Sequence, residues 1–217
     1  MKRDIKVIIV DDHPVVREGL KSSLGKWEGI TVSGEAETGA ELIKKLKRDR
    51  FDIILLDLNL TDKGGLEILE QLKLQNNTIP VLVFSVGSEK EYALRALKAG
   101  AAGYIHKQSN TGEIAAAIVK VASGRTYMSD TVQELMRQSL LSGEKNSGPL
   151  HRSLSDRELE VMLLISRGMS NKEIGGKLNI SEKTVSTYLS RTFEKMNFSN
   201  RAELIKYVSD HNLDPPG

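Results

Sequence analysis

One short apolar run, Ile53 to Leu56, ends on an acid, Asp57. The run is too short for an independent helix and lacks the alternation of a half-exposed strand. It therefore predicts a central strand of a parallel sheet, buried on both faces. Ligands of open α/β sheets bind outside the carboxyl ends of the strands, so Asp57 stands where a reactive group is expected.

Similar apolar runs alternate with segments of helical spacing as far as Gly124. Strands that alternate with single helices predict βαβ units and right-handed crossovers. We therefore predict an α/β domain of the (βα)5 type, with a doubly wound parallel sheet of order 2-1-3-4-5. The expected strands are Lys6 to Val10, Thr31 to Ala36, Asp52 to Leu56, Pro80 to Val86 and Gly103 to His106. The expected helices are Val15 to Leu24, Ala40 to Lys47, Leu66 to Leu74, Tyr92 to Ala99 and Ile114 to Val121.

A stretch without apolar side chains, Ser142 to Pro149, follows a short amphipathic run from Thr131 to Leu141. Gly, Ser and Asn without hydrophobic residues cannot order themselves by burial, so the stretch predicts a flexible linker. We divide the chain into a first domain at residues 1–125, a linker at 126–149 and a second domain at 150–217.

The second domain carries helix-start signals of the S-x-x-E type at Ser155, Ser170 and Asn200, and Ser181 opens a further segment. Such caps satisfy the otherwise orphaned N–H groups of a first helical turn. We predict a small all-α domain whose second and third helices have the spacing of a helix-turn-helix. The four expected helices are about 156–167, 171–178, 182–196 and 201–210.

Composition excludes several classes of protein. The net charge is only +2, from 31 basic and 29 acidic residues, so any contact with nucleic acid must be local. The absence of cysteine excludes a disulfide framework and a thiolate metal site. No stretch approaches the roughly 18 apolar residues of a membrane span, and the first apolar run ends too soon for a secretion signal. We therefore expect a soluble cytoplasmic protein with no membrane partner.

Polar side chains follow four of the predicted strands. Asp11 and Asp12 follow the first strand and Asp57 the third, while Ser85 and Lys107 end the fourth and fifth. The switch point between strands 1 and 3 brings these ends to one crevice. Three carboxylates there repel one another unless a cation intervenes, and a hard ion such as Mg²⁺ is the natural partner. With a lysine and a hydroxyl group, this set is suited to phosphoryl transfer onto an aspartate.

Each acid taken alone is as well explained as the cap of the following helix. The joint placement of polar groups at four strand ends is what favours a shared site.

Several short motifs then point to a known family. They are Val10-Asp11-Asp12-His13, Leu56-Asp57-Leu58, Gly65-Leu66-Glu67, the fourth-strand Ser85 and Gly103-Tyr104-Ile105-His106-Lys107. On these motifs the first domain resembles a receiver domain. Over almost its full length the chain is similar to two-component response regulators of the NarL/FixJ type.

This resemblance implies that Asp57 accepts phosphate from a histidine kinase and that Lys107 binds the phosphoryl group. Ser85 and Tyr104 would form a switch pair, because a new phosphate attracts the serine hydroxyl and leaves space into which the tyrosine rotates. The implied Mg²⁺ ligands are Asp11, Asp12, Asp57 and the carbonyl group of Asn59. The loop from Leu60 to Gly65 departs from many receivers because it lacks a proline.

The second domain resembles the LuxR-type family. The motifs are Leu154 to Glu158, Gly168 to Ile174, Ile180 to Val185 and Arg201 to Leu204. At about 100° per residue, one side of the third helix is expected to pack inward. That side carries Val185, Leu189, Thr192, Phe193 and Met196, and the opposite side carries Lys183, Thr187, Ser190 and Glu194. If this is the recognition helix, its polar side enters the major groove of double-stranded DNA, although a merely solvated face is the alternative.

The candidate DNA contacts fall into two groups. Hydroxyl groups can hydrogen-bond several bases, so readout by Thr184, Ser186, Thr187 and Ser190 is expected to be weak for each contact. Basic residues hold phosphates and set affinity without choosing sequence. They are Lys172, Lys177, Lys183, Arg191, Lys195 and Arg201. The family resemblance further implies a homodimer promoted by phosphorylation, with Ala202 to Val208 contributing to it.

The leading hypothesis is thus a phosphorylation-regulated transcription regulator that is not an enzyme. A second keeps the fold but treats the first domain as a constitutive dimerisation module. A third follows from Asp57-Leu58-Asn59-Leu60-Thr61, which is similar to the D-x-D-x-T signature of aspartate-nucleophile phosphatases. Asn59 replaces the second acid of that signature, so a phosphatase would lack its proton shuttle.

Overall fold

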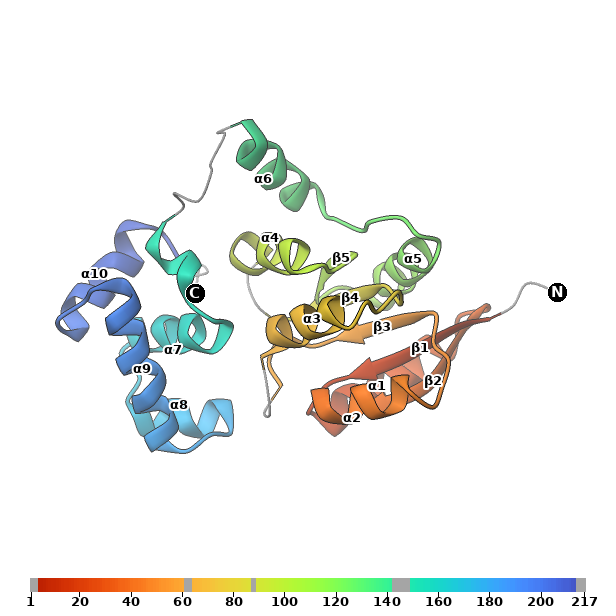
Figure 1. The fold of residues 1–217 in the computed structure, drawn as a ribbon, viewed down its shortest axis with the longest axis horizontal. Coiled ribbons are helices and arrows are strands. Elements are labelled where there is room, and N and C mark those ends of the chain that lie inside the picture. Colours follow the sequence, from red (N-terminus) through yellow and green to blue (C-terminus); the bar gives the residue numbers. More distant parts are fainter. Residues whose placement is uncertain (1–3, 61–63, 87–88, 142–148, 214–217) are drawn as a thin grey trace. The chain divides into compact units, whose positions relative to one another are not determined.

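The computed structural model of the chain describes residues 4–60, 64–86, 89–141 and 149–213. The chain divides into two compact units, Met1–Ser142 and Gly143–Gly217. Figure 1 shows an α/β unit followed by an all-α unit.

The α/β unit contains a five-stranded sheet in the order β2-β1-β3-β4-β5, with all neighbouring strands parallel. This confirms the predicted fold class and strand order. The strands are β1 Ile5–Val10, β2 Ile30–Ala36, β3 Ile53–Leu56, β4 Val81–Ser85 and β5 Gly103–His106. In the register of the central pair, Val10 lies opposite Leu56, so β1 and β3 end at the same level.

Helices cover both faces of this sheet, because successive strand side chains point to opposite faces and both sets are apolar and buried. On one face, α1 (Pro14–Leu24) and α5 (Thr111–Ala122) pack against residues such as Val7, Ile9 and Ile53. The other crossover helices are α2 (Gly39–Leu46), α3 (Gly65–Leu74) and α4 (Glu89–Ala99). The apolar runs of the sequence thus form the core predicted for them.

A sixth helix, α6 (Asp130–Leu141), packs against α4 (Figure 1). Val132 on its inner side is fully buried, and the Ser129 hydroxyl group donates a hydrogen bond of 2.6 Å to Glu89 Oε2. The helix lies inside the predicted linker of residues 126–149 and includes the whole amphipathic run from Thr131 to Leu141. Within that linker, residues 142–148 lie outside the described residues, and the domain boundaries stay a prediction.

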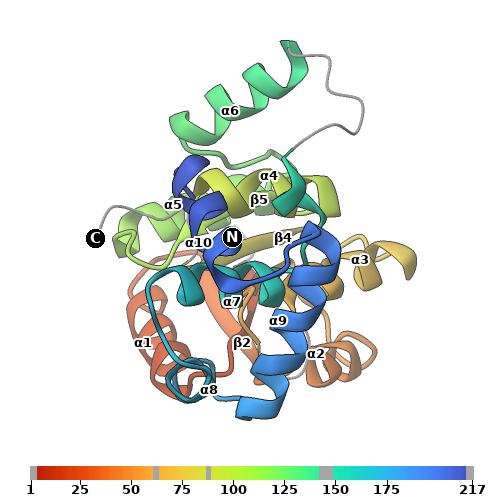
Figure 2. The same ribbon diagram turned by 90° about the vertical axis from the view of Figure 1, so that its left-hand side faces the viewer.

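The all-α unit begins with a short 3₁₀ helix, η1 (Leu150–Ser153), and continues with four α-helices (Figure 2). They are α7 (Asp156–Ser166), α8 (Asn171–Leu178), α9 (Glu182–Met196) and α10 (Arg201–Asp210). Helix α9 packs against α7 and α8, and α10 packs against α7. The predicted four-helix region is confirmed.

The ends of these helices follow from their capping residues. Ser155 and Ser170 form complete capping boxes with the glutamates three residues later. Helices α8 and α9 end on Asn179 and Asn197, whose φ angles of 53° and 57° place them in the left-handed region. The stop at Asn179 fixes the tight turn between α8 and α9. No helix among the described residues is long and apolar enough to cross a bilayer.

Candidate functional site

The sheet register places two acids side by side at its carboxyl edge. The Asp57 N–H group donates to the Val10 carbonyl at 2.9 Å, and the Asp11 N–H group donates to the Ala36 carbonyl at 3.1 Å. Each acid therefore prolongs the hydrogen-bond ladder of its strand by one residue. Gly65 allows the chain to fold back closely, because a Cβ atom there would lie 2.7 Å from the Asp57 carbonyl oxygen. The two carboxylates are only 1% and 2% exposed.

Lys107 bridges these two carboxylates. Its Nζ atom lies 2.5 Å from Asp11 Oδ2 and 2.8 Å from Asp57 Oδ2. The Lys107 N–H group donates to the Ser85 carbonyl, which anchors the residue at the end of β5. The Asn59 N–H group donates to the second oxygen of Asp57 at 3.2 Å. The predicted convergence of strands 1, 3 and 5 on one site is therefore present.

Burial and charge act in opposite directions in this pocket. Burial raises the pKa of Asp57 and the negative charge of Asp11 adds to this, while Lys107 offsets only part of the shift. Burial alone would lower the pKa of Lys107, but the carboxylates of Asp57 and Asp11 outweigh it and raise that pKa. Lys107 is thus a cation at neutral pH, and it contacts the Asp57 carboxyl group, whose ionised form is disfavoured by burial.

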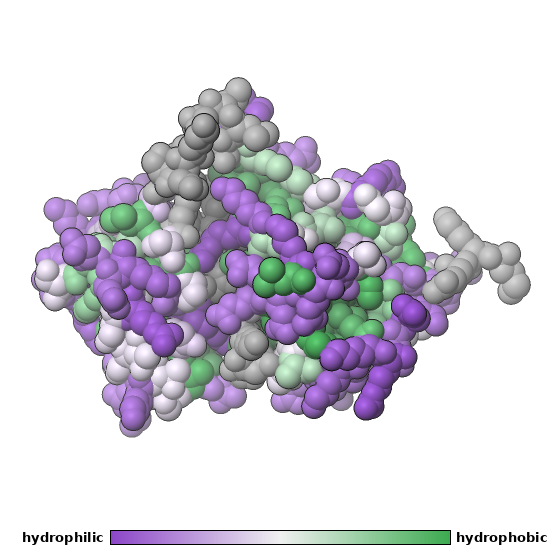
Figure 3. Space-filling view, in the orientation of Figure 1, coloured by the Kyte–Doolittle hydropathy of each residue, from purple (hydrophilic) through white to green (hydrophobic). Residues whose placement is uncertain are grey.

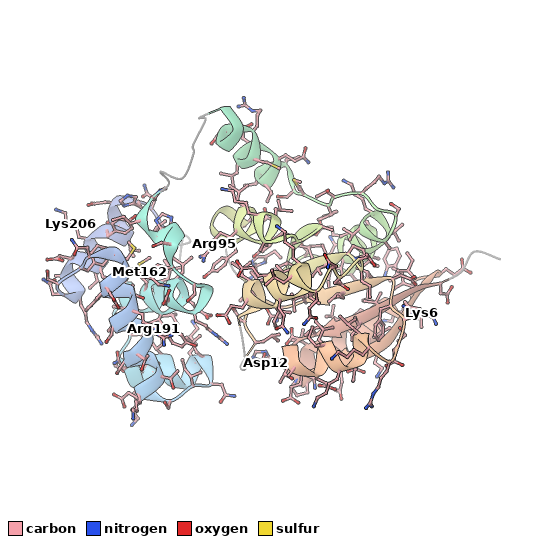
Figure 4. The ribbon with its side chains drawn as sticks, viewed as in Figure 1. Lys6, Asp12, Arg95, Met162, Arg191 and Lys206 are labelled. Carbon is pink, nitrogen blue, oxygen red and sulfur yellow. The ribbon has the colours of Figure 1, made fainter. Side chains whose placement is uncertain are left out.

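The residues present fit a divalent cation. Ligand atoms of Asp11, Asp12, His13 and Asp57 all lie within 4.8 Å of one another. Within the part of the chain that the structure describes, Asp12 Oδ1 is buried and accepts no hydrogen bond, although His13 Nδ1 lies 2.7 Å away. Such a buried oxygen needs a cation or a donor. Figure 4 shows Asp12 at the end of β1 opposite to Lys6.

Two contacts in the pocket were missed from the sequence. Arg17 Nη1 donates to the Asp11 carbonyl oxygen at 2.6 Å and so ties α1 to the acidic loop. The His13 N–H group donates to Asp11 Oδ1 at 2.8 Å. A hydrogen bond from a side chain to a backbone carbonyl leaves no periodic pattern in the sequence. The one available signal was the position of Arg17, one helical turn after His13.

Ser85 and Tyr104, the expected switch pair, are both buried, with exposures of 1% and 0%. The Tyr104 ring therefore already lies inside the unit in this structure, and no outward position is seen from which it would rotate. Lys107 Nζ lies 5.7 Å from the centre of the Phe84 ring, which borders Ser85.

In the all-α unit, α9 presents the face predicted from its spacing. Val185, Leu189, Thr192 and Met196 are buried and Phe193 is half-buried. The predicted outer residues Lys183, Thr187, Ser190 and Glu194 are exposed. Figure 4 shows Arg191 on the same helix, and the visible face of this unit in Figure 3 is mostly hydrophilic.

The hydroxyl groups of the candidate DNA-reading set already have hydrogen-bond partners. Ser186, Thr187 and Ser190 donate to carbonyl oxygens one turn earlier in α9, at 3.0 to 3.1 Å. The Thr184 hydroxyl group lies 2.7 Å from that of the N-cap residue Ser181. Ser186, Thr187 and Ser190 therefore keep acceptor lone pairs, while their hydroxyl hydrogens are bound within the helix.

The basic candidates differ in their environment. Lys172, Lys177, Lys183 and Arg191 are exposed on α8 and α9. By contrast, Lys195 Nζ donates to Glu158 Oε2 at 2.7 Å, and Arg201 Nη2 donates to Asn171 Oδ1 at 2.6 Å. Burial alone would raise the pKa of Glu158, but the hydrogen bonds from Lys195 and Ser155 outweigh it and lower that pKa.

Replacing Lys195 by methionine is expected to lower the free energy of unfolding of the all-α unit by about 1–2 kcal/mol near neutral pH, because a charged hydrogen bond to a buried acid is lost. A carboxyl group with a lowered pKa stabilises the fold above its ordinary pKa and ceases to do so as the pH falls through the folded value. The deficit should therefore shrink in acid. Hydrogen exchange of amides in α7 and α9 measures it, with the exposed Lys206→Met variant (Figure 4) as control. Equal protection in Lys195→Met and wild type would contradict the structural role.

Comparison with known proteins agrees with both halves. Residues 7–119 match the response regulator receiver domain, and residues 152–208 match the bacterial regulatory proteins of the luxR family. Response regulator UvrY of Escherichia coli strain K12 is 35% identical over 209 residues, which cover 96% of this chain and 95% of UvrY. Response regulator protein VraR of Staphylococcus aureus strain Mu3 is 36% identical over 209 residues, which cover 96% of this chain and 98% of VraR.

A solved structure adds a likeness in three dimensions. RcsB from Salmonella enterica serovar Typhimurium, bound to promoter rprA in the presence of the phosphomimetic BeF₃⁻, has a TM-score of 0.60 and 26% sequence identity. The match covers 95% of this chain and 99% of RcsB. Another RcsB structure contains two dimers bound to two parallel DNAs.

The parallel sheet with an acidic pocket and the helix-turn-helix unit together define a DNA-binding regulatory protein rather than an enzyme. The chain belongs to the two-component response regulators, with a receiver domain followed by a LuxR-type DNA-binding domain. Its pocket of Asp11, Asp12 and Asp57 is typical of the Mg²⁺ site of receiver domains.

Proposed function

We propose that Asp57 accepts a phosphoryl group from a histidine kinase and that the modified protein binds DNA as a homodimer. The observation that carries this proposal is the bridge from Lys107 to two buried carboxylates at 2.5 and 2.8 Å. Helix capping does not require two acids to share one lysine, whereas phosphoryl transfer needs both a nucleophile and a cation.

In this proposal an oxygen of Asp57 forms the new bond to phosphorus while the bond to the donor nitrogen breaks. Lys107 then moves its charge from the Asp57 carboxylate to a phosphoryl oxygen, which is a point-charge contact that lysine suits. Asp11, Asp12, Asp57 and the carbonyl of Asn59 would hold Mg²⁺, which supplies charge neutralisation for the transferred group. The role of these residues is to keep nucleophile and cation within reach of each other.

The new phosphoryl group would be read by Ser85. A hydroxyl group at the end of β4 can donate a charge-assisted hydrogen bond to it, and Tyr104 is packed inside the same region of the sheet. Movement of Ser85 would change the surface around α4, against which α6 is packed. Phosphorylation would in this way reach the segment that leads to residues 142–149.

On DNA, α9 would lie in the major groove, with Thr184, Ser186, Thr187 and Ser190 near base edges. The exposed residues Lys172, Lys177, Lys183 and Arg191 would hold phosphates, and Arg201 and Lys195 would add to them. A single module of this size buries a limited interface, which favours two copies, and α10 would contribute to the dimer. We further propose that the protein is cytoplasmic. We also propose that its first domain ends at residue 125 and its second begins at residue 150.

Removal of Mg²⁺ tests the chemistry. With a small phosphodonor and Mg²⁺, we expect one phosphoryl group to be added per chain, with a shift from monomer to dimer in sedimentation. A chelator should abolish both, because three neighbouring carboxylates are then left without their cation. The two alternatives give other results: a constitutive module takes up no phosphoryl group, and a phosphatase consumes many equivalents of donor.

A further inference from the structure

One amide side chain links three helices of the DNA-binding unit. Asn171, the first residue of α8, accepts a hydrogen bond of 2.6 Å from Arg201, the first residue of α10. The same amide donates at 3.0 Å to the hydroxyl group of Ser186 on α9. Ser186 in turn donates to the carbonyl oxygen of Glu182 at 3.1 Å. These residues are separated by 15 and 30 positions in the sequence, so the link is tertiary.

The chemistry of the groups allows only this direction of hydrogen bonding. A guanidinium group can only donate, so it must face the oxygen of the Asn171 amide. The amide nitrogen then faces Ser186, whose oxygen can accept because its own hydrogen points to Glu182. Each of the three hydrogen bonds pairs a donor with an acceptor, and the network fixes the rotamer of the half-buried Asn171 side chain.

This arrangement decides what Ser186 can offer to a base. A hydroxyl group has one hydrogen and two lone pairs. In Ser186 the hydrogen and one lone pair are occupied, which leaves one lone pair on an exposed side chain. In the major groove, the groups that donate to such an acceptor are the amino groups of adenine N6 and cytosine N4.

We propose that Asn171 is a positioning residue that makes Ser186 an acceptor selective for a base with a major-groove amino group. Because Arg201 has further N–H groups beyond the one bound to Asn171, it can contact a phosphate at the same time. Contact with the DNA backbone and readout by α9 are then made through one rigid network. This inference rests on the proposed function, in which α9 enters the major groove.

The test uses the full chain, phosphorylated with a small phosphodonor, and a duplex selected by it from a random pool. Affinity is measured for that duplex, for each single-base change in it and for a scrambled duplex. At one position wild type is expected to prefer adenine or cytosine. Asn171→Ala and Asn171→Leu should each reduce this preference about tenfold, which is about 1.4 kcal/mol. Leucine is close to asparagine in side-chain length, so the Asn171→Leu variant separates loss of the amide group from loss of side-chain bulk.

Two further variants separate positioning from general loss. Ser186→Ala should lose the same preference, and the double variant should lose no more than Ser186→Ala alone, because both changes break one network. Lys172→Ala, next to Asn171 on α8, should weaken binding to selected and scrambled duplexes equally.

The inference is overturned if the Asn171 variants keep the wild-type base preference within twofold, or if the losses of the two single variants multiply. If wild type binds no selected duplex more tightly than a scrambled one, the proposed DNA readout itself fails. That result differs from the one that overturns the inference alone, in which wild type prefers the selected duplex and the Asn171 variants keep the same base preference.

Discussion

Replacing Asp57 with asparagine is expected to abolish acyl-phosphate formation completely. The carboxamide is close in size to the acid but offers no anionic oxygen to attack phosphorus. Lys107 is still present in the variant, but without an acyl phosphate at position 57 there is no phosphoryl oxygen for its ammonium group to contact. Intact-protein mass spectrometry after incubation with a small phosphodonor and Mg²⁺ counts the phosphoryl groups directly.

The matched control for this variant is Asp52→Asn. Asp52 belongs to the same stretch but lies at the other end of β3, where its carboxylate accepts a hydrogen bond of 2.8 Å from the Lys6 N–H group. Because Asp52 lies at the start of β3 and the pocket lies at its end, we expect the Asp52→Asn variant to take up one phosphoryl group per chain, as wild type does. Labelling that persists in Asp57→Asn, or disappears in Asp52→Asn, would show that the acceptor is another residue.

The second large effect is expected from Lys107→Met. This change removes the cation that lies 2.5 and 2.8 Å from two buried carboxylates and leaves them facing each other. Breaking a buried pair by removing one partner costs roughly 3 kcal/mol or more. We expect the free energy of unfolding of the α/β unit to fall by about 3 kcal/mol at neutral pH, in the absence of Mg²⁺.

The pH dependence of this loss has a definite sign. Without Lys107 the folded-state pKa of Asp57, already raised by burial, must rise further. An acid with a raised pKa leaves stability intact below its unfolded pKa and reduces it as the pH rises through the folded value. The deficit of Lys107→Met should therefore be largest at neutral pH and disappear on acidification.

Urea unfolding followed by tryptophan fluorescence isolates the α/β unit, because Trp27 is the single tryptophan of the chain. Lys6→Met, on the same sheet but exposed at the opposite end of β1 (Figure 4), serves as control and should change stability little. A Lys107→Met variant as stable as wild type across this pH range would refute the bridging role of the lysine.

The sheet was predictable because its apolar runs are continuous and its acids stand at run ends. Helix starts were harder. Helix α4 begins at Glu89 and not at Tyr92, because its first turn is polar and carries no apolar period. Helix α5 begins at Thr111 and not at Ile114. The Asn110–Glu113 capping box that starts it is present in the sequence, but the apolar spacing used for the prediction begins only at Ile114.

The convergence of Asp11, Asp57 and Lys107 could be predicted from topology alone, because the switch point of such a sheet brings these strand ends together. The finer contacts could not. Lys195 is a candidate phosphate contact because of its charge, and the hydrogen bond of its ammonium group to Glu158, 37 positions away, was not predicted. A tertiary pairing of this kind leaves no mark in the local sequence.

Control of DNA binding by the acidic pocket is tested by the affinity of the full chain for a selected DNA duplex, measured before and after treatment with a phosphodonor and Mg²⁺. Wild type is expected to bind at least about tenfold more tightly after treatment, a change of about 1.4 kcal/mol. Asp57→Asn should bind equally in both states. Equal affinity of wild type with and without the donor, or the same gain in Asp57→Asn, would contradict the claim that the pocket controls DNA binding.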